Sequence, residues 1–328
     1  MKVWYDACTG KHIRYGTVIA RRLRKAGHEV VFTTRKHPDT IGLANILGEN
    51  PIVVGKYDPS TLSTRLEESA KRTLQFSKLF THNLPDLAIS HQSVELCRTA
   101  FGLNIPMILT ADTPHATAVN KLTIPLANLL VVSEAIPKRF FKNYGAQNIV
   151  QFRGVDEVAW IGNFKPSKDF EFKKPLIVVR QIETKASYAL GNEDVTLKLA
   201  QKLSRFGNVV FLSRYAKVKE EGITVMDRLQ DSASLVAHAD LFIGAGGTIS
   251  REAALQGVPS IAISEMSHTY VNTYLAKKGF PLFVLDQSKV LGQAKKCLKM
   301  TFDVKAKLAK LENPIDIIER ILAEKKFA

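Results

Sequence analysis

The chain has 328 residues, 45% of them hydrophobic, which suits two domains that each bury a core. No run approaches the ~18 apolar residues that cross a bilayer. The N-terminal MKVWYDACTG has an acid too early and too short an apolar run for a signal peptide, so we expect a cytoplasmic protein. Lys and Arg number 46 against 31 Asp and Glu, and the net charge of +15 favours anionic partners, namely nucleotides, phospholipid surfaces or nucleic acid.

Short apolar runs alternate with helical patterns through the first half of the chain. Helical patterns cover residues 12–26 and 61–80, and the expected strands are KVWYD, EVVFTT, PIVVGK, DLAIS, PMILTAD, NLLVVS and NIVQF. Strand, helix and strand at this spacing are the signature of βαβ units and a parallel sheet. We therefore predict a Rossmann-like N-terminal domain over residues 1–155.

A second series of strands follows a break in the pattern. Glycines, prolines and mixed charges interrupt it, and we interpret residues 156–175 as a linker. The runs LIVVR, NVVFLS, ITVM, DLFIGA, PSIAIS and PLFVLD then predict a C-terminal Rossmann-like domain over 176–310. Residues 311–328 contain one amphipathic helix that we expect to pack on the N-terminal domain. The fold class is α/β, with two doubly wound parallel-sheet domains facing a cleft.

The stretch GAGGTISREAALQGVP follows the predicted strand DLFI. Gly246 and Gly247 allow close backbone approach, and the free N–H groups at the start of the next helix can hold a phosphate. Thr248 can add a hydroxyl, and Glu252, about one turn further on, can accept hydrogen bonds from ribose hydroxyls. The alternative is an ordinary turn capped by Thr248 or Ser250, because GAGG is neither a GxGxxG fingerprint nor a Walker loop.

Polar side chains also follow strands of the first domain. Asp112 and His115 lie in TADTPHA, where a carboxylate can orient an imidazole and raise its basicity; a turn with Asp112 as a helix cap is the alternative. His91 lies in AISHQS and is a candidate for the cleft, whereas Ser93 is expected to cap the next helix.

Basic and polar residues in the second domain are candidates for binding a diphosphate. Arg180 ends its first predicted strand, where a guanidinium can clamp a diphosphate; an ion pair with a nearby glutamate is the alternative. Lys185 and Ser187 follow on the same loop.

Two segments resemble the glycosyltransferase-B superfamily. GAGGTISREAALQGVPSI is similar to the donor-nucleotide segment of the peptidoglycan N-acetylglucosaminyltransferase and of the non-hydrolysing UDP-N-acetylglucosamine 2-epimerases. This resemblance implies that the glycine turn contacts the diphosphate and that Glu252 binds the ribose. It also implies that the loop SEMSHTY faces the donor sugar, with Glu265 and His268 as candidate contacts to its hydroxyl groups, and that the first domain lies on the acceptor side. The second segment, TGKHIRYGTVIARRLRKAGHEV, includes Gly10 and resembles the TGGH loop of the same transferase. This resemblance implies that His12 is the base for the acceptor hydroxyl. Lys11 departs from that loop, which has a second glycine there, and can add a cation facing phosphate.

Most of the chain resembles an archaeal family of glycosyltransferase-B-like proteins of unassigned function. The motifs GKYDPS, TADTPHA, GVDEVAW and GAGGTISREAA carry this resemblance. It implies the fold strongly and leaves the reaction open.

The sequence favours a metal-independent glycosyltransferase that uses a UDP-sugar. No HExxH, clustered His/Cys set or DxD-type pair occurs, so we expect no metal and no cofactor beyond the nucleotide sugar. The alternatives are a UDP-sugar 2-epimerase, with acids and bases from Asp112, His91 and His115, and a non-catalytic nucleotide-sugar-binding protein. We expect a lipid-phosphate or glycan acceptor, with the protein peripheral at the membrane inner face. No RNP motif or zinc finger indicates nucleic acid.

Overall fold

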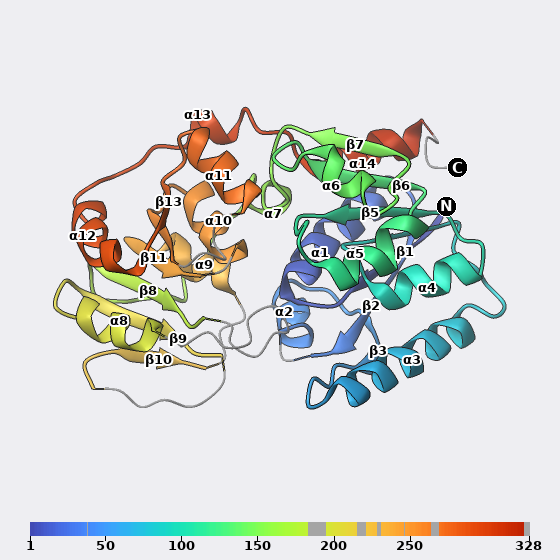
Figure 1. Cartoon of the computed structure of the whole chain (residues 1–328), viewed down its shortest axis with the longest axis horizontal. Helices are drawn as coiled ribbons and strands as arrows, with labels where there is room; N and C mark the ends of the chain where they lie inside the picture. Colours follow the sequence, from blue (N-terminus) through green and yellow to red (C-terminus); the bar gives the residue numbers. More distant parts are fainter. Residues whose placement is uncertain are drawn as a thin grey trace. The chain divides into compact units, whose positions relative to one another are not determined.

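The computed structural model describes residues 1–37, 39–182, 195–214, 221–227, 231–245, 247–263 and 269–324. The chain divides into two compact units, one made of Met1–Trp160 with Glu312–Ala328 and the other of Ile161–Leu311. Each unit holds one parallel sheet with helices against it, which confirms the predicted pair of Rossmann-like α/β domains (Figure 1). Residues 156–160 of the expected linker belong to the first unit, and 161–175 belong to the second.

The first unit contains a seven-stranded sheet in the order β3-β2-β1-β4-β5-β6-β7. The order reverses between β1 and β4, which creates a switch point where open α/β sheets bind ligands beyond the carboxyl ends of their strands. The strands are β1 (Lys2–Ala7), β2 (Glu29–Lys36), β3 (Ile52–Lys56), β4 (Leu87–Ser90), β5 (Met107–Ala111), β6 (Leu129–Ser133) and β7 (Ile149–Phe152).

Helix α1 crosses the sheet at close range. A side chain added at Gly16 would stand 2.2 Å from Cε1 of Tyr5, so the absence of a Cβ permits this approach. The rings of Phe76, on α3, and of Phe80, which caps the end of α3, each pack 4.7 Å from the ring of Trp4. The helices of this unit are α1 (Gly10–Lys25), α2 (Ile41–Ile46), α3 (Leu62–Leu79), α4 (Val94–Gly102), α5 (Thr117–Thr123), the 3-10 turn η1 (Ile124–Leu126), α6 (Lys138–Lys142) and α7 (Val158–Ile161), which crosses into the second unit.

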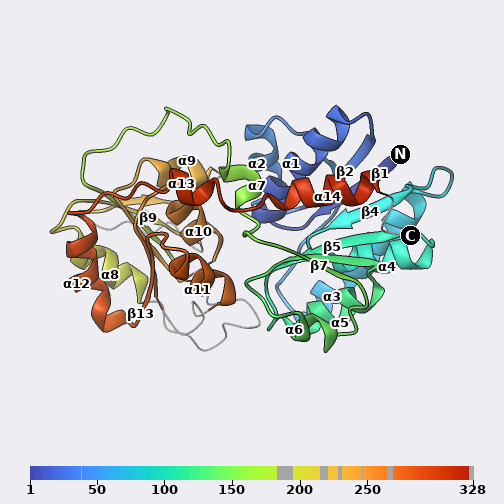
Figure 2. The same cartoon turned by 90° about the horizontal axis from the view of Figure 1, so that it is seen from above.

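The last helix, α14 (Pro314–Ala323), returns to the first unit (Figure 2). Asn313 caps it by accepting a hydrogen bond from the backbone of Ile315, and proline begins it, both of which favour a helix start. Its apolar face is buried against β6 and α1. Arg22 of α1 binds Asp316 at 2.9 Å and also contacts Glu319.

The second unit contains a six-stranded parallel sheet in the order β10-β9-β8-β11-β12-β13. Alternate residues of β8 enter two apolar clusters, Ile177 and Val179 in one and Leu176 and Val178 in the other, so the sheet is covered on both faces. Its elements are β8 (Leu176–Arg180), α8 (Thr196–Leu203), β9 (Asn208–Leu212), β10 (Thr224–Met226), α9 (Ser232–Ala237), β11 (Leu241–Gly244), α10 (Thr248–Leu255), β12 (Ser260–Ile263), α11 (Tyr270–Lys277), β13 (Leu282–Leu285), α12 (Gln287–Cys297) and α13 (Lys305–Leu308).

Candidate functional site

The carboxyl edge of the first sheet gathers titratable side chains from separate loops. Lys11 and His12 begin α1, His91 follows β4, and Asp112 follows β5. Asp156, which lies between β7 and α7, joins them. Because parallel strands end at one edge of a sheet, residues far apart in sequence meet there. The structure therefore brings together four of the predicted site residues and adds a carboxylate.

The ammonium of Lys11 lies at the centre of this cluster. Its Nζ donates to Asp112 Oδ2 at 2.6 Å and to Asp156 Oδ2 at 2.8 Å, and it lies 3.4 Å from His91 Nε2. Only 11% of the Lys11 side chain and 3% of the Asp156 side chain are exposed, so these contacts are little screened by water. One ammonium is therefore the counter-charge of both carboxylates.

Hydrogen bonds fix the ring of His91 from both sides. Nδ1 lies 2.7 Å from Thr110 Oγ1, and Nε2 lies 3.3 Å from Asp112 Oδ1. The next residue, Gln92, adopts a left-handed backbone with φ 55° and donates to Asn120 Oδ1 at 2.7 Å. A non-glycine residue in this conformation is held by its surroundings, so the loop after β4 presents His91 in one orientation.

His12 stands beside this cluster with its ring 5.0 Å from the ring of His91. Its Nδ1 accepts a hydrogen bond from the backbone N–H of Cys8 at 3.3 Å. Burial, and then the neighbouring charges of His91 and Lys11, lower the pKa of His12 well below its ordinary value. The imidazole is therefore neutral near pH 7.

A buried ion network lies behind the loop that carries Cys8. Asp6, at the end of β1, accepts hydrogen bonds from Arg72 Nη2 at 2.5 Å, Ser93 Oγ at 2.6 Å and Thr33 Oγ1 at 2.7 Å. Arg72 also contacts Glu95 Oε2 at 3.2 Å. All of these side chains are at least nine-tenths buried. The network ties β1, α3 and α4 together beneath the cluster. It also gives Ser93 a second role besides its predicted capping of α4, which the structure confirms.

The cluster has the donors of a cation site but already contains a cationic group. One ligand atom each from His91, Asp112 and Asp156 lie within 4.8 Å of one another. The Lys11 ammonium binds both carboxylates at hydrogen-bond distance, so it supplies positive charge at that place. We therefore describe the group as an ammonium–carboxylate cluster and assign no metal to it.

The remaining predicted residues of the first unit lie around this cluster. Gly10 is the first residue of α1, and a side chain there would stand 3.1 Å from the backbone oxygen of Asp39. His115 is exposed, and among the described residues no side-chain contact joins it to the cluster. Asp112 does not cap α5, whose N-cap is Ala116.

The glycine turn of the second unit leads into α10 as predicted. Gly247 is the N-cap residue and Thr248 is the first helical residue, and no side chain caps the helix. A Cβ on Gly247 would lie 2.5 Å from Nη1 of the buried Arg251, so the turn rests against a guanidinium. Arg180 ends β8 and its Nη1 lies 3.4 Å from the backbone oxygen of Ser213.

Glu252 has an internal partner in the second unit. It is fully buried, and its Oε2 accepts a hydrogen bond from Ser232 Oγ of α9 at 2.9 Å. Its expected contact with a ribose stays a prediction. Other predicted residues lie outside the described part of the chain: Lys185, Ser187, Gly246, Glu265 and His268.

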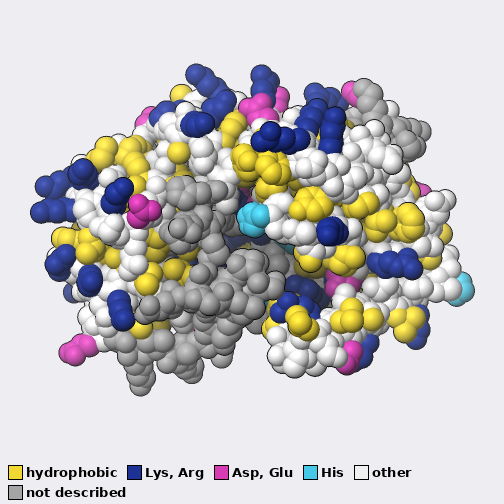
Figure 3. Space-filling view, in the orientation of Figure 1, with side chains coloured by type: hydrophobic (Ala, Val, Ile, Leu, Met, Phe, Trp, Pro, Cys, Tyr) yellow, Lys and Arg dark blue, Asp and Glu magenta, His cyan; other side chains and the backbone are white. Residues whose placement is uncertain are grey.

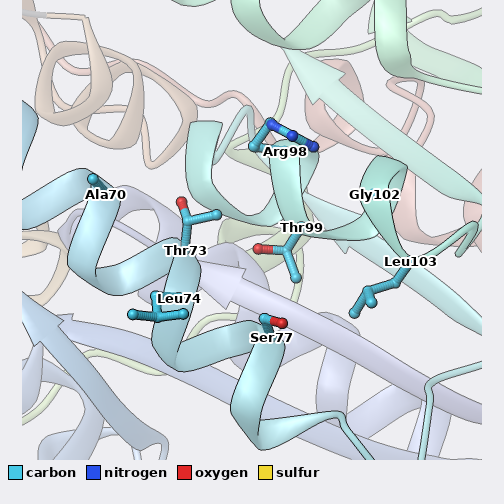
Figure 4. Close-up of a pocket in the computed structure, with 8 residues that line it drawn as sticks. All are labelled: Ala70, Thr73, Leu74, Ser77, Arg98, Thr99, Gly102 and Leu103. Atoms are coloured by element: carbon cyan, nitrogen blue, oxygen red, sulfur yellow. The ribbon is translucent and has the colours of Figure 1, made fainter.

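A cavity of about 340 Å³ lies on the first unit between α3 and α4 (Figure 4). It is lined by residues of α3, among them Leu74 and Ser77, and of α4, among them Arg98 and Thr99. None of the predicted site residues lines this cavity. On the face shown in Figure 3, the Lys and Arg side chains are scattered over both units and form no continuous stripe among the atoms coloured by type. Within the described residues, no helix combines the length and apolar character needed to span a bilayer.

Solved structures share this architecture over nearly the whole chain. The UDP-GlcNAc 2-epimerase of Methanocaldococcus jannaschii, in complex with UDP-GlcNAc and UDP, superimposes with a TM-score of 0.75 at 15% identity, covering 99% of this chain and 100% of that one. Spinosyn forosaminyltransferase SpnP gives 0.62 at 15% identity, covering 98% of each chain. The fold is therefore the glycosyltransferase-B fold, which transferases and epimerases share.

The sequence comparisons show the family of the chain. Residues 1–326 match the family described as "Protein of unknown function (DUF354)". A relative from M. jannaschii, "Uncharacterized protein MJ0665", is 31% identical over 339 residues and covers 98% of both chains. The chain belongs to the DUF354 family.

Sequence reasoning missed Asp156 as a site residue. The signal was present, because an acid follows the predicted strand NIVQF by four residues in the motif GVDE. The glycine and the mixed charges around it favoured a linker. In the structure, Gly154 approaches the backbone oxygen of Glu312 so closely that a Cβ would stand 2.3 Å from it. This contact with the returning C-terminal segment holds Asp156 in the first unit.

Proposed function

We propose that this protein is a metal-independent glycosyltransferase that uses a nucleotide sugar, with UDP as the nucleotide. The observation that carries the proposal is the Lys11–Asp112–Asp156–His91 cluster, in which acid–base groups from separate loops lie within hydrogen-bonding distance. It occupies the edge where open α/β sheets bind ligands. The fold shared with proteins solved with UDP supports a nucleotide site in the second unit.

The second unit is assigned the nucleotide diphosphate. The N–H groups at the start of α10, which no side chain caps, and the positive end of its dipole would attract a phosphate, and Arg180 would supply a cation at the end of β8. These groups would stabilise the negative charge of the departing UDP, which a metal ion neutralises in metal-dependent transferases.

We assign the proton transfer to residues of the first unit. Asp112 is the most exposed acid–base group of the cluster, with 15% of its side chain accessible against 5% for His91 and 3% for Asp156. Its carboxylate would take the proton of the acceptor hydroxyl. The acceptor oxygen then bonds to the anomeric carbon, and the bond from that carbon to the diphosphate oxygen breaks with its electron pair leaving on UDP. Lys11 orients the carboxylate throughout.

A second candidate is a UDP-sugar 2-epimerase. Transfer needs one base, whereas the cluster holds two carboxylates and an imidazole around Lys11. Epimerisation removes a proton beside the anomeric carbon, expels UDP and then reverses both steps on the other face, so it uses more than one acid–base group. Asp156 is the observation that favours this alternative.

One set of incubations separates these functions. The purified chain is mixed with a panel of UDP-sugars, with and without a lipid-phosphate or glycan acceptor, and released UDP and the sugar configuration are measured. UDP released only with acceptor indicates transfer, and a changed sugar without acceptor indicates epimerisation. Asp112→Asn should abolish either activity, whereas Glu67→Gln, on an exposed face of α3, should not. No turnover and no thermal stabilisation by UDP would refute both.

A further inference from the structure

The hydrogen bond at His12 determines which ring nitrogen carries the proton. The backbone N–H of Cys8 can only donate, so the Nδ1 atom that it contacts at 3.3 Å must be an acceptor. A neutral imidazole has one donor and one acceptor nitrogen, and therefore its hydrogen lies on Nε2. Among the described residues, no hydrogen-bond partner occupies Nε2, and the side chain is half-buried, which leaves this N–H for a ligand.

Neighbouring groups hold the ring in this neutral form. Lys11 precedes it, and Arg35 Nε donates to the backbone oxygen of Cys8 at 3.0 Å, so two cations lie close by. His91 packs edge-on at 5.0 Å, and the carboxylate of Asp112 is the acidic group that acts in the opposite direction. Burial is the largest cause that lowers the pKa of His12, ahead of these charges. A second proton on the ring is therefore disfavoured.

We propose that His12 donates a hydrogen bond from Nε2 to a substrate oxygen and does not serve as the base. Accepting a proton at Nδ1 would break the hydrogen bond from Cys8, and Nε2 already carries a hydrogen. The proton of the acceptor instead goes to Asp112, as described above. His12 stabilises negative charge that develops on the bound oxygen, as a neutral donor in an oxyanion site does. The substrate in this inference rests on the proposed function, whereas the tautomer of His12 does not.

The tautomer is tested without any turnover. In ¹⁵N-labelled protein near pH 7, long-range ¹H–¹⁵N correlations of the His12 ring, assigned by comparison with His12→Gln, distinguish Nε2–H from Nδ1–H. The Nε2–H pattern is expected. An Nδ1–H pattern, or a doubly protonated ring, would overturn the proposal whether or not the protein has the proposed activity.

Matched variants test the role of the donor in the active enzyme. Gln places an amide N–H near the position of Nε2, Asn places its amide near Nδ1, and neither is a base. We expect kcat for His12→Gln within about 10-fold of the natural chain, and losses of about 10²- to 10³-fold for His12→Asn and His12→Ala. If kcat falls as much in His12→Gln as in His12→Ala, the donor role is wrong. A base would be absent from all three variants, so their losses of kcat would then be equal.

Discussion

Replacing Arg72 by Met should destabilise the first unit strongly. The guanidinium is 1% exposed, bonds Asp6 at 2.5 Å and Glu95 at 3.2 Å, and also donates to the backbone oxygen of Val54 at 2.8 Å. Met fills similar volume but leaves two buried carboxylates without a cation. Removing one partner of a buried ion pair costs about 3–5 kcal/mol, because the remaining charge stays desolvated. We expect the free energy of unfolding of this unit to fall by about that amount.

Tryptophan fluorescence during urea unfolding measures this unit selectively. Both tryptophans of the chain, Trp4 and Trp160, belong to the first unit and are buried. Trp4 Nε1 donates to Thr33 Oγ1 at 2.9 Å, and Thr33 in turn contacts Asp6, so this probe reports on the network itself. Lys71→Met, on the exposed face of the same helix, is the control and should not change the midpoint. A loss below about 1 kcal/mol for Arg72→Met would refute the reasoning from the buried pair.

Three further outcomes follow from the same contacts. Lys11→Met leaves Asp112 and Asp156 without their ammonium, so kcat should fall about 10²-fold. Steady-state kinetics check this, with Lys56→Met as the control at an exposed lysine. Burial, and then Asp6, raises the pKa of Cys8 from 9.0 to about 11. The unfolded chain therefore loses this proton first, so the stability of the first unit should fall as pH rises from 9 to 11, and Cys8→Ala should flatten that slope in urea midpoints. Gly247→Ala would press a Cβ against Arg251, and UDP should then raise the melting temperature less than in the natural chain.

Local patterns predicted the fold because the central strands of each sheet are short, buried and parallel. The predicted strand KVWYD corresponds to β1 (Lys2–Ala7), and DLAIS corresponds to β4 (Leu87–Ser90). The helical pattern at 61–80 corresponds to α3 (Leu62–Leu79). Such strands are apolar on both faces, and amphipathic helices lie between them in the sequence. The hydrophobic periodicity alone therefore distinguishes strands from helices.

The buried network was beyond this kind of prediction. Arg72 lies on α3 among Glu67, Glu68 and Lys71, a composition typical of a solvated helix face. Its burial depends on Asp6, which lies 66 residues earlier in the chain. Only the packing of α3 against the sheet brings them together. For the site, strand-end position was sufficient to predict His91 and Asp112, and the resemblance to the TGGH loop singled out Lys11 and His12. The position of Asp156 in the cluster depends on tertiary packing.

Lys11 gives a physical reason for the departure from the TGGH loop that this segment resembles. A glycine there has no side chain, so Asp112 and Asp156 would face each other without a counter-charge. The two carboxylates would then repel each other. With Lys11 between them, each carboxylate has a counter-charge within hydrogen-bond distance, and Asp112 is the more exposed of the two. We therefore expect Lys11 and Asp156 to act together, so Asp156→Asn should lose activity in the natural chain but cost little more once Lys11 is Met.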